Sequence, residues 1–167
     1  ARKKDVLLIN QFSNKLNIDT HYNTTAKEIL NKLNNIGGFV SGVGSGGTLM
    51  GVTNRLKEVF PNLKVALVEP KNSEIINKNK VNSHKIEGIA DDFIPDNFKK
   101  ENITHYYSIS DEDAITMSKM LAKELGLGVG ISSGANFLGS VLLNEDVNNV
   151  VTIFSDDNKK YLSILKD

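Results

Sequence analysis

A glycine-rich segment, residues 42–48 (GVGSGGT), carries the clearest chemical pattern of the sequence. It follows a short apolar run and precedes a run with helical spacing, so we expect a strand-to-helix turn. At such a turn, free backbone N–H groups and the positive end of the helix dipole can bind a phosphate. Glycines let the backbone approach a ligand, and Ser45 and Thr48 can add hydroxyl donors. The segment therefore predicts an anion site.

The residues of this segment leave several interpretations open. A nucleoside-triphosphate loop needs a lysine at the position of Thr48, which makes that ligand a poor fit. A dinucleotide fits formally, because Gly42, Gly44 and Gly47 satisfy G-x-G-x-x-G and Glu69 ends the next predicted strand about 20 residues later. A glycine turn that only packs a helix on a strand is the third possibility.

Composition excludes several other classes of function. The 20 basic and 20 acidic residues cancel, so no net field gathers nucleic acid or a membrane surface. The absence of cysteine excludes disulfides and a cysteine nucleophile, and fits a cytoplasmic protein. His21, His84 and His105 are far apart, so no metal site is expected. A start without methionine or a signal-peptide core indicates sequence from within a longer chain or a processed product.

The elements that would position the glycine segment alternate along the chain. Buried strands are expected at residues 5–9, 39–41, 65–68 and 150–154, and Tyr106 and Tyr107 are also expected in a strand. Helices are expected at 25–34, 49–59, 110–125 and 136–143. Thr25 and Glu28 would form a capping box, and residues 71–84 a polar surface excursion. Alternating strands and helices predict one α/β domain, with a mainly parallel sheet and flanking helices.

Eight blocks in order along the chain resemble the cysteine synthase (O-acetylserine sulfhydrylase) and cystathionine β-synthase family. They are QFSN (11–14), HYNTT (21–25), SGVGSGGTL (41–49), VEP (68–70), HKIEGI (84–89), FIP (93–95), GISSGA (130–135) and YLS (161–163). The likeness covers nearly the whole chain and favours pyridoxal phosphate over a dinucleotide. It implies that residues 1–167 are the C-terminal, cofactor-binding portion of a fold-type II enzyme, most of its large domain.

The resemblance also assigns roles to single residues. Gly44, Ser45, Gly46, Gly47 and Thr48 would bind the cofactor phosphate. Ser132 would bond to the pyridine nitrogen, where a neutral hydroxyl suits elimination and replacement at the β carbon. Gly88 would lie beside the cofactor, and Gln11 would contact the substrate carboxylate. Family members are usually homodimers.

Two departures from the family bear directly on catalysis and substrate. The blocks that carry the Schiff-base lysine and the substrate-carboxylate loop precede this region in the family, so no residue here is assigned a catalytic role. The isolated chain is expected to need the N-terminal half of the same enzyme. A non-catalytic binding or regulatory fragment is the alternative.

The second departure is Asp92, which resembles an aspartate usual in cystathionine β-synthase. A carboxylate there could pair with the ammonium group of an amino thiol. The resemblance implies β-replacement on O-acetylserine or cysteine, by sulfide or by an amino thiol. The products would be cysteine, lanthionine or cystathionine, with hydrogen sulfide released when cysteine is the substrate. Alternatively, Asp91 and Asp92 are a solvated loop pair.

Overall fold

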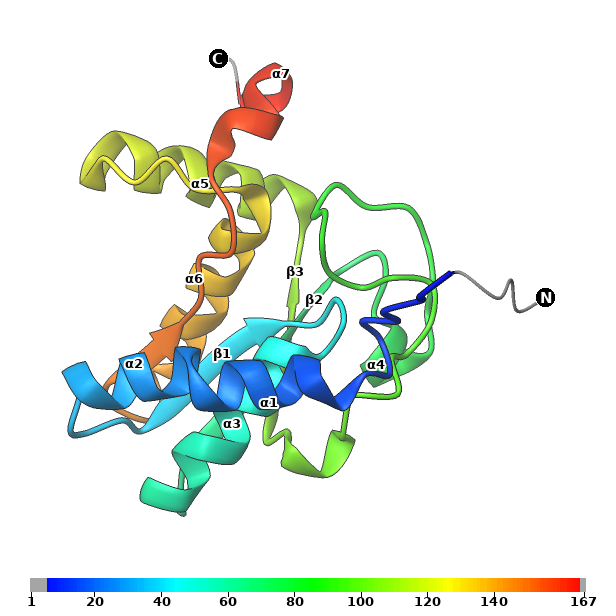
Figure 1. Ribbon diagram of the computed structural model, residues 1–167. Coiled ribbons are helices and arrows are strands. Elements are labelled where there is room, and N and C mark those ends of the chain that lie inside the picture. Colours follow the sequence, from blue (N-terminus) through cyan, green and yellow to red (C-terminus); the bar gives the residue numbers. More distant parts are fainter. Residues whose placement is uncertain (1–5, 166–167) are drawn as a thin grey trace.

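The structure is a computed structural model that describes residues 6–165. A four-stranded sheet with the order β3-β2-β1-β4 lies between two groups of helices (Figure 1). All neighbouring strands are parallel. The strands are β1 (Gly38–Gly42), β2 (Lys64–Pro70), β3 (His105–Ile109) and β4 (Val150–Thr152). The parallel α/β fold expected from the alternating pattern is confirmed.

The two faces of the sheet are both buried, because successive side chains of a strand point to opposite faces. Phe39 and Val65 belong to one hydrophobic core, together with residues of α2 (Thr25–Lys32) and α3 (Gly47–Val59). Val40 and Ala66 belong to a second core, with residues of α5 (Asp111–Leu125) and α6 (Ile131–Leu143). A further helix, α1 (Lys15–Asn23), packs against α3. The glycine segment joins β1 to α3 and is held between these layers.

The ends of α5 agree with the local sequence. The Ser110 hydroxyl accepts a hydrogen bond from the Asp113 N–H at 3.1 Å, as an N-cap should. Acidic residues occupy the first turn, where the helix dipole favours negative charge. Gly126 ends the helix in the left-handed conformation, with φ of 69°. The predicted helix before Pro61 is also confirmed, as α3.

The strand predicted at residues 5–9 is wrong for the part that the structure describes. Asp5 lies outside the described residues, and residues 6–9 form no strand. Their apolar side chains are 68–88% exposed. A strand needs a neighbouring strand for its backbone hydrogen bonds, and this run instead leads away from the sheet into the start of α1 (Figure 1).

Four further expectations need correction. The N-cap of α2 is Thr24, whose hydroxyl donates to the Thr20 carbonyl at 2.7 Å and caps no N–H group of α2. Thr25 and Glu28 therefore form no capping box, and the helix ends at Lys32. Helix α6 begins at Ile131 rather than Asn136. Its first turn, residues 131–134 (ISSG), is helical although serine and glycine have weak helix propensity. The excursion at 71–84 contains α4 (Ile75–Lys78), whose first two side chains are buried.

Three short helices complete the described part of the chain. They are η1 (Lys100–Asn102), η2 (Asn158–Tyr161) and α7 (Leu162–Leu165). Within residues 6–165, none of the helices has the length and apolar character needed to cross a membrane.

Candidate functional site

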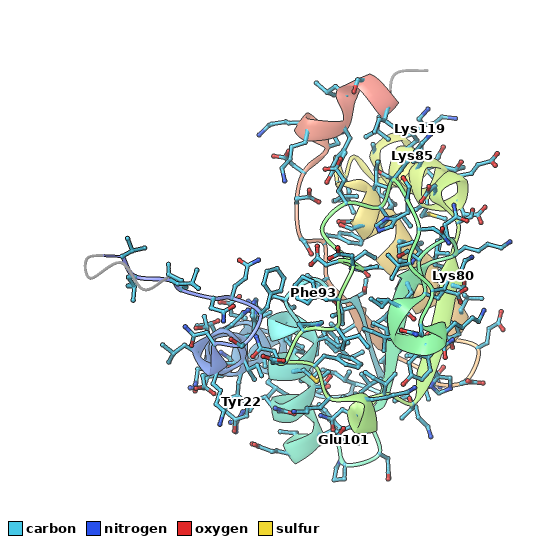
Figure 2. The ribbon with its side chains drawn as sticks, turned by 90° about the vertical axis from the view of Figure 1, so that its right-hand side faces the viewer. Tyr22, Lys80, Lys85, Phe93, Glu101 and Lys119 are labelled. Atoms are coloured by element: carbon cyan, nitrogen blue, oxygen red, sulfur yellow. The ribbon has the colours of Figure 1, made fainter. Side chains whose placement is uncertain are left out.

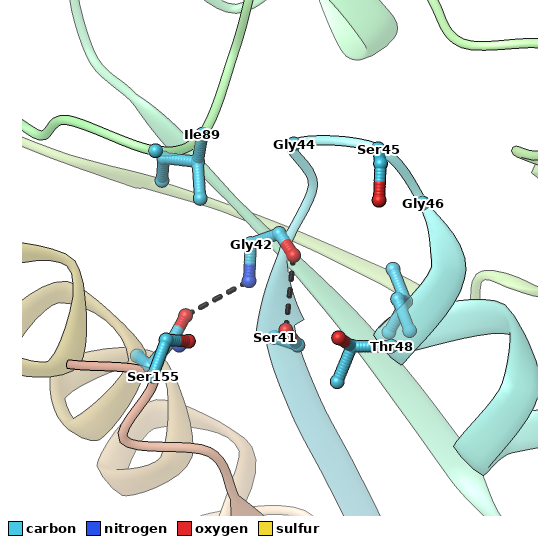
Figure 3. Close-up of a pocket in the computed structure, with 11 residues that line it drawn as sticks. Ser41, Gly42, Gly44, Ser45, Gly46, Thr48, Ile89 and Ser155 are labelled. Carbon is cyan, nitrogen blue, oxygen red and sulfur yellow. Dashed lines mark hydrogen bonds between the residues drawn. The ribbon is translucent and has the colours of Figure 1, made fainter. Parts of the chain in front are cut away.

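A polar cavity lies at the carboxyl end of β1. Strand β2 pairs with one edge of β1, and β3 lies beyond β2. Strand β4 pairs with the opposite edge of β1, so the order of the strands reverses at β1. Open parallel sheets bind ligands in the crevice at such a reversal of strand order. The cavity is lined from β1 and the glycine segment on one side and by Ser155, which follows β4, on the other (Figure 3).

The lining can bind an anion without a charged side chain. Among the described residues, the eleven that line the cavity are all uncharged, and they include Ser45 and Thr48. Gly46 precedes α3 with φ of 82°, a conformation that favours glycine, and offers no side-chain oxygen to cap the helix. Apart from a contact of 3.5 Å from the Gly47 N–H to Ser45 Oγ, the first N–H groups of α3 are left for another acceptor, at the positive end of the helix dipole.

A second loop lies directly on the glycine segment. The Ala90 N–H donates to the Val43 carbonyl at 2.8 Å. A Cβ built on Gly44 would overlap the carbonyl oxygen of Gly88, so only glycine allows this approach. Gly88 itself lines the cavity with φ of 86°, and a Cβ built there would meet no described atom within 4 Å. The cradle thus has backbone donors, hydroxyls and open space beside Gly88, which fits a phosphorylated cofactor.

Gly47 differs from the other predicted phosphate-binding residues in its position. It is not among the residues that line the cavity. A Cβ built on it would overlap the side chain of Asn17 in α1. Gly47 therefore allows α1 to pack closely behind the glycine segment.

Asn136 is a site residue that the sequence analysis did not single out. Its side chain is 2% exposed and lines the cavity. The Oδ1 atom accepts from the Gly42 N–H at 2.8 Å, drawn as a dashed line in Figure 3, and Nδ2 donates to the Ile153 carbonyl at 2.9 Å. One amide therefore ties the end of β1, α6 and the segment after β4 together. The only signal in the sequence was an amide beside the apolar residues of the helix predicted at 136–143.

Ser132 lies close to this junction. It is buried, with 5% exposure, in the first turn of α6 rather than in a loop. Ser132 and Asn136 are four residues apart on a helix, so they share one face. Ser132 does not itself line the cavity formed by the described residues. The neighbouring Ser133 hydroxyl is buried without a hydrogen-bond partner in the described chain.

The segments that carry Gln11 and Asp92 meet beside the glycine segment. The Gln11 carbonyl accepts hydrogen bonds from the side-chain amides of Asn17 at 2.9 Å and Asn97 at 2.8 Å. Phe12 packs edge to face on Phe93, labelled in Figure 2, with 4.8 Å between ring centroids. The side chains of Gln11 and Asp92 are exposed and are not among the described residues that line the cavity.

The dinucleotide alternative depends on Glu69. The carboxylate of this residue makes its hydrogen bonds away from the cavity. Its carboxylate is 3% exposed and accepts from the N–H groups of Ile76 at 2.7 Å and Asn77 at 3.1 Å. Burial raises the pKa of this carboxyl group, although the two backbone donors lower it. It anchors α4 and does not face the cavity. Within residues 6–165, no group of three His, Asp or Glu side chains could hold a metal ion.

Comparison with known proteins decides the ligand class. The profile of the family described as pyridoxal-phosphate dependent enzyme matches residues 1–156. The chain belongs to this family. Its cofactor is pyridoxal phosphate, and the family match therefore sets the dinucleotide interpretation aside.

Individual relatives show which members of the family the chain is similar to. The chain is 42% identical to cysteine synthase B of Campylobacter jejuni over 159 residues, 93% of this chain and 53% of that protein. It is 39% identical to the O-acetylserine dependent cystathionine beta-synthase of Bacillus subtilis, over 92% of this chain and 51% of that protein. A hydrogen sulfide-producing enzyme from Fusobacterium nucleatum has a similar structure, with a TM-score of 0.92 and 49% identity over 96% of this chain and 50% of that one. The chain thus spans about half the length of the relatives it matches.

Proposed function

We propose that this chain provides the cofactor-phosphate site of a pyridoxal-phosphate-dependent β-replacement enzyme. The observation that carries the proposal is the uncharged cavity at the carboxyl end of β1, with Ser45, Thr48 and the uncapped start of α3 around it. A phosphate dianion in that cavity would be held by neutral donors and the helix dipole. The relatives are cysteine synthases and cystathionine β-synthases, which supports β-replacement as the reaction class.

The chain's own residues would bind and orient the cofactor. Residues 44–48 would bind its phosphate, and the Ser132 hydroxyl would hydrogen-bond to its ring nitrogen. Gly88 would leave room for the ring. When bound, pyridoxal phosphate withdraws electrons from the substrate's α carbon, and the uncharged Ser132 moderates that withdrawal. This moderation favours replacement at the β carbon.

For the substrates, we propose O-acetylserine or cysteine, with sulfide or an amino thiol as the nucleophile. The bond from the β carbon to the acetate oxygen or thiol sulfur breaks, and a bond to the nucleophile's sulfur forms. Gln11 would bind the substrate carboxylate, and Asp92 would pair with the ammonium group of an amino thiol. The exposure of both side chains and the joining of their segments through Asn97 support this assignment. Cysteine as both substrates would give lanthionine and hydrogen sulfide.

The proposed partner of this chain is the N-terminal half of the same enzyme. The half-length match to the relatives supports it, and so does the exposed apolar run at residues 6–9, which lacks a neighbouring strand in the described chain. That half would supply the lysine that binds the cofactor, since the cavity lining of the described residues contains none. Homodimer formation and a cytoplasmic location remain predictions from the family resemblance and the composition.

The test uses the complete protein with pyridoxal phosphate. An absorbance band of the bound cofactor is expected, together with cysteine formation from O-acetylserine and sulfide. Cofactor binding without any product would favour the non-catalytic binding fragment instead.

The role of Asp92 is tested by the products of the complete protein. Asp92→Asn should lower thioether formation from an amino thiol relative to cysteine formation from sulfide, because the ammonium group loses its partner. Asp96→Asn, an exposed aspartate of the same loop, is the matched control and should leave the ratio unchanged. An unchanged ratio for Asp92→Asn would remove the proposed substrate role.

A further inference from the structure

Helix α1 presents two polar side chains to the two hydroxyl groups of the phosphate cradle. The Asn17 Nδ2 atom lies 2.8 Å from Ser45 Oγ, and the His21 Nε2 atom lies 3.1 Å from Thr48 Oγ1. Asn17 and His21 are four residues apart, so they lie on the same face of the helix. Both contacts come from one rigid element behind the cradle.

Two glycines of α3 allow this approach. A Cβ built on Gly47 would overlap the Asn17 side chain, and one built on Gly51 would lie 2.8 Å from the Cβ of His21. Larger residues at either position would push α1 away from the cradle. The spacing of Gly47 and Gly51 therefore matches that of the two side chains they accommodate.

The contact with Asn17 determines where the Ser45 proton can point. A serine hydroxyl has one proton and two acceptor lone pairs. The Asn17 amide can only donate to Ser45 Oγ through Nδ2, and the Gly47 N–H makes a longer contact of 3.5 Å with the same atom. With its lone pairs occupied, Ser45 keeps its proton for another acceptor. Because Ser45 lines the cavity, an anion bound there would receive it.

A chain of three groups acts on Thr48 in the same way. The Thr25 hydroxyl lies 3.0 Å from His21 Nδ1, and donation to that atom leaves the ring proton on Nε2. In this tautomer His21 donates to Thr48 Oγ1, whose own proton is then free for the cavity, whereas in the opposite tautomer Thr48 would donate to His21. Burial lowers the pKa of His21, which favours the neutral ring that this arrangement uses.

We propose that Asn17 and His21 are positioning residues that direct the hydroxyl protons of Ser45 and Thr48 toward the cofactor phosphate. The inference rests on the proposed function, because it takes pyridoxal phosphate as the ligand of the cavity. The same Asn17 amide also donates to the Gln11 carbonyl, so it joins the proposed substrate segment to the cradle.

The experiment compares pyridoxal phosphate with pyridoxal, which lacks the phosphate, in titrations of the complete protein freed of cofactor. Asn17→Ala should weaken pyridoxal phosphate binding roughly tenfold, the effect of one lost oriented hydrogen bond to a charged group, and leave pyridoxal binding unchanged. Asn23→Ala is the matched control, because within residues 6–165 this exposed amide donates only to the Asp19 carbonyl of its own helix. It should change neither affinity.

A double-mutant cycle separates positioning from folding. In a Ser45→Ala background, Asn17→Ala should have little further effect on pyridoxal phosphate affinity. Asn17→Asp keeps the shape of the side chain and should weaken binding more than Asn17→Ala, because the new carboxylate accepts the Ser45 proton and repels the phosphate. His21→Ala should weaken phosphate-dependent binding, and His21→Gln, which keeps an N–H donor, should restore part of it.

The outcomes distinguish failure of the positioning role from failure of the proposed function. Equal losses for pyridoxal phosphate and pyridoxal, or a full Asn17→Ala effect in the Ser45→Ala background, would overturn the positioning role. Wild-type affinity in Asn17→Asp would do the same. Failure of the unmodified complete protein to bind pyridoxal phosphate would instead overturn the proposed function.

Discussion

Replacing Asn136 by alanine tests the junction that closes one side of the cavity. The substitution removes the acceptor of the Gly42 N–H and the donor to the Ile153 carbonyl, at 2.8 and 2.9 Å. Leaving a buried polar group unpaired costs about 1–3 kcal/mol, so two such groups correspond to about 2–6 kcal/mol. Water in the open cavity can rehydrate the Gly42 N–H, which places the expected destabilisation near the lower end, at about 2–3 kcal/mol.

The assay is urea-induced unfolding of the complete protein, with pyridoxal phosphate affinity measured on the same samples. Ser140→Ala, one helical turn later in α6, is the matched control. Its hydroxyl donates at 2.7 Å to the Phe137 carbonyl of the same helix, so its loss should change stability by less than about 1 kcal/mol. A loss below about 0.5 kcal/mol for Asn136→Ala would refute the claim that this amide holds β1, α6 and the segment after β4 together.

Two further predictions concern the cradle and its supporting helix. Gly44→Ala should weaken pyridoxal phosphate binding by more than about tenfold in a fluorescence titration, because the new Cβ would overlap the backbone carbonyl of Gly88. Gly126→Ala is the control. Gly126 has a φ of 69° and lies in open space, so this substitution should lower stability and leave the affinity for pyridoxal phosphate intact. Burial lowers the pKa of His21 below 6.5, so the unfolded chain binds more protons than the folded one. The contribution of neutral His21 to the free energy of unfolding should therefore be fully present above pH 6.5. It should be lost as the pH falls from 6.5 through the lower folded-state pKa. A stability difference between wild type and His21→Gln that is the same well above and well below pH 6.5 would contradict this.

The elements that the sequence predicted well are those with local determinants. Helix α5 has an acceptor at Ser110, acids in its first turn and a left-handed glycine at Gly126, and each acts within a few residues. The strand cores of β1 and β2 are buried apolar runs. The glycine segment was predicted between a strand and a helix, and it lies there.

The missed features depend on contacts between distant residues. Helix α1 has no fully buried residue, and its place depends on packing against Gly47 and Gly51. Asn136 is important because three separate segments meet at its amide. The apolar run at 6–9 satisfied the pattern of a buried strand, but a strand requires a neighbour that the described chain does not provide.

The most direct measurement is a crystal structure of the complete protein with pyridoxal phosphate bound. We predict that the phosphate lies in the cavity at the carboxyl end of β1, within hydrogen-bond distance of the Ser45 and Thr48 hydroxyls and of N–H groups at the start of α3. Ser132 should contact the ring nitrogen. A phosphate bound away from residues 44–48 would contradict the central claim.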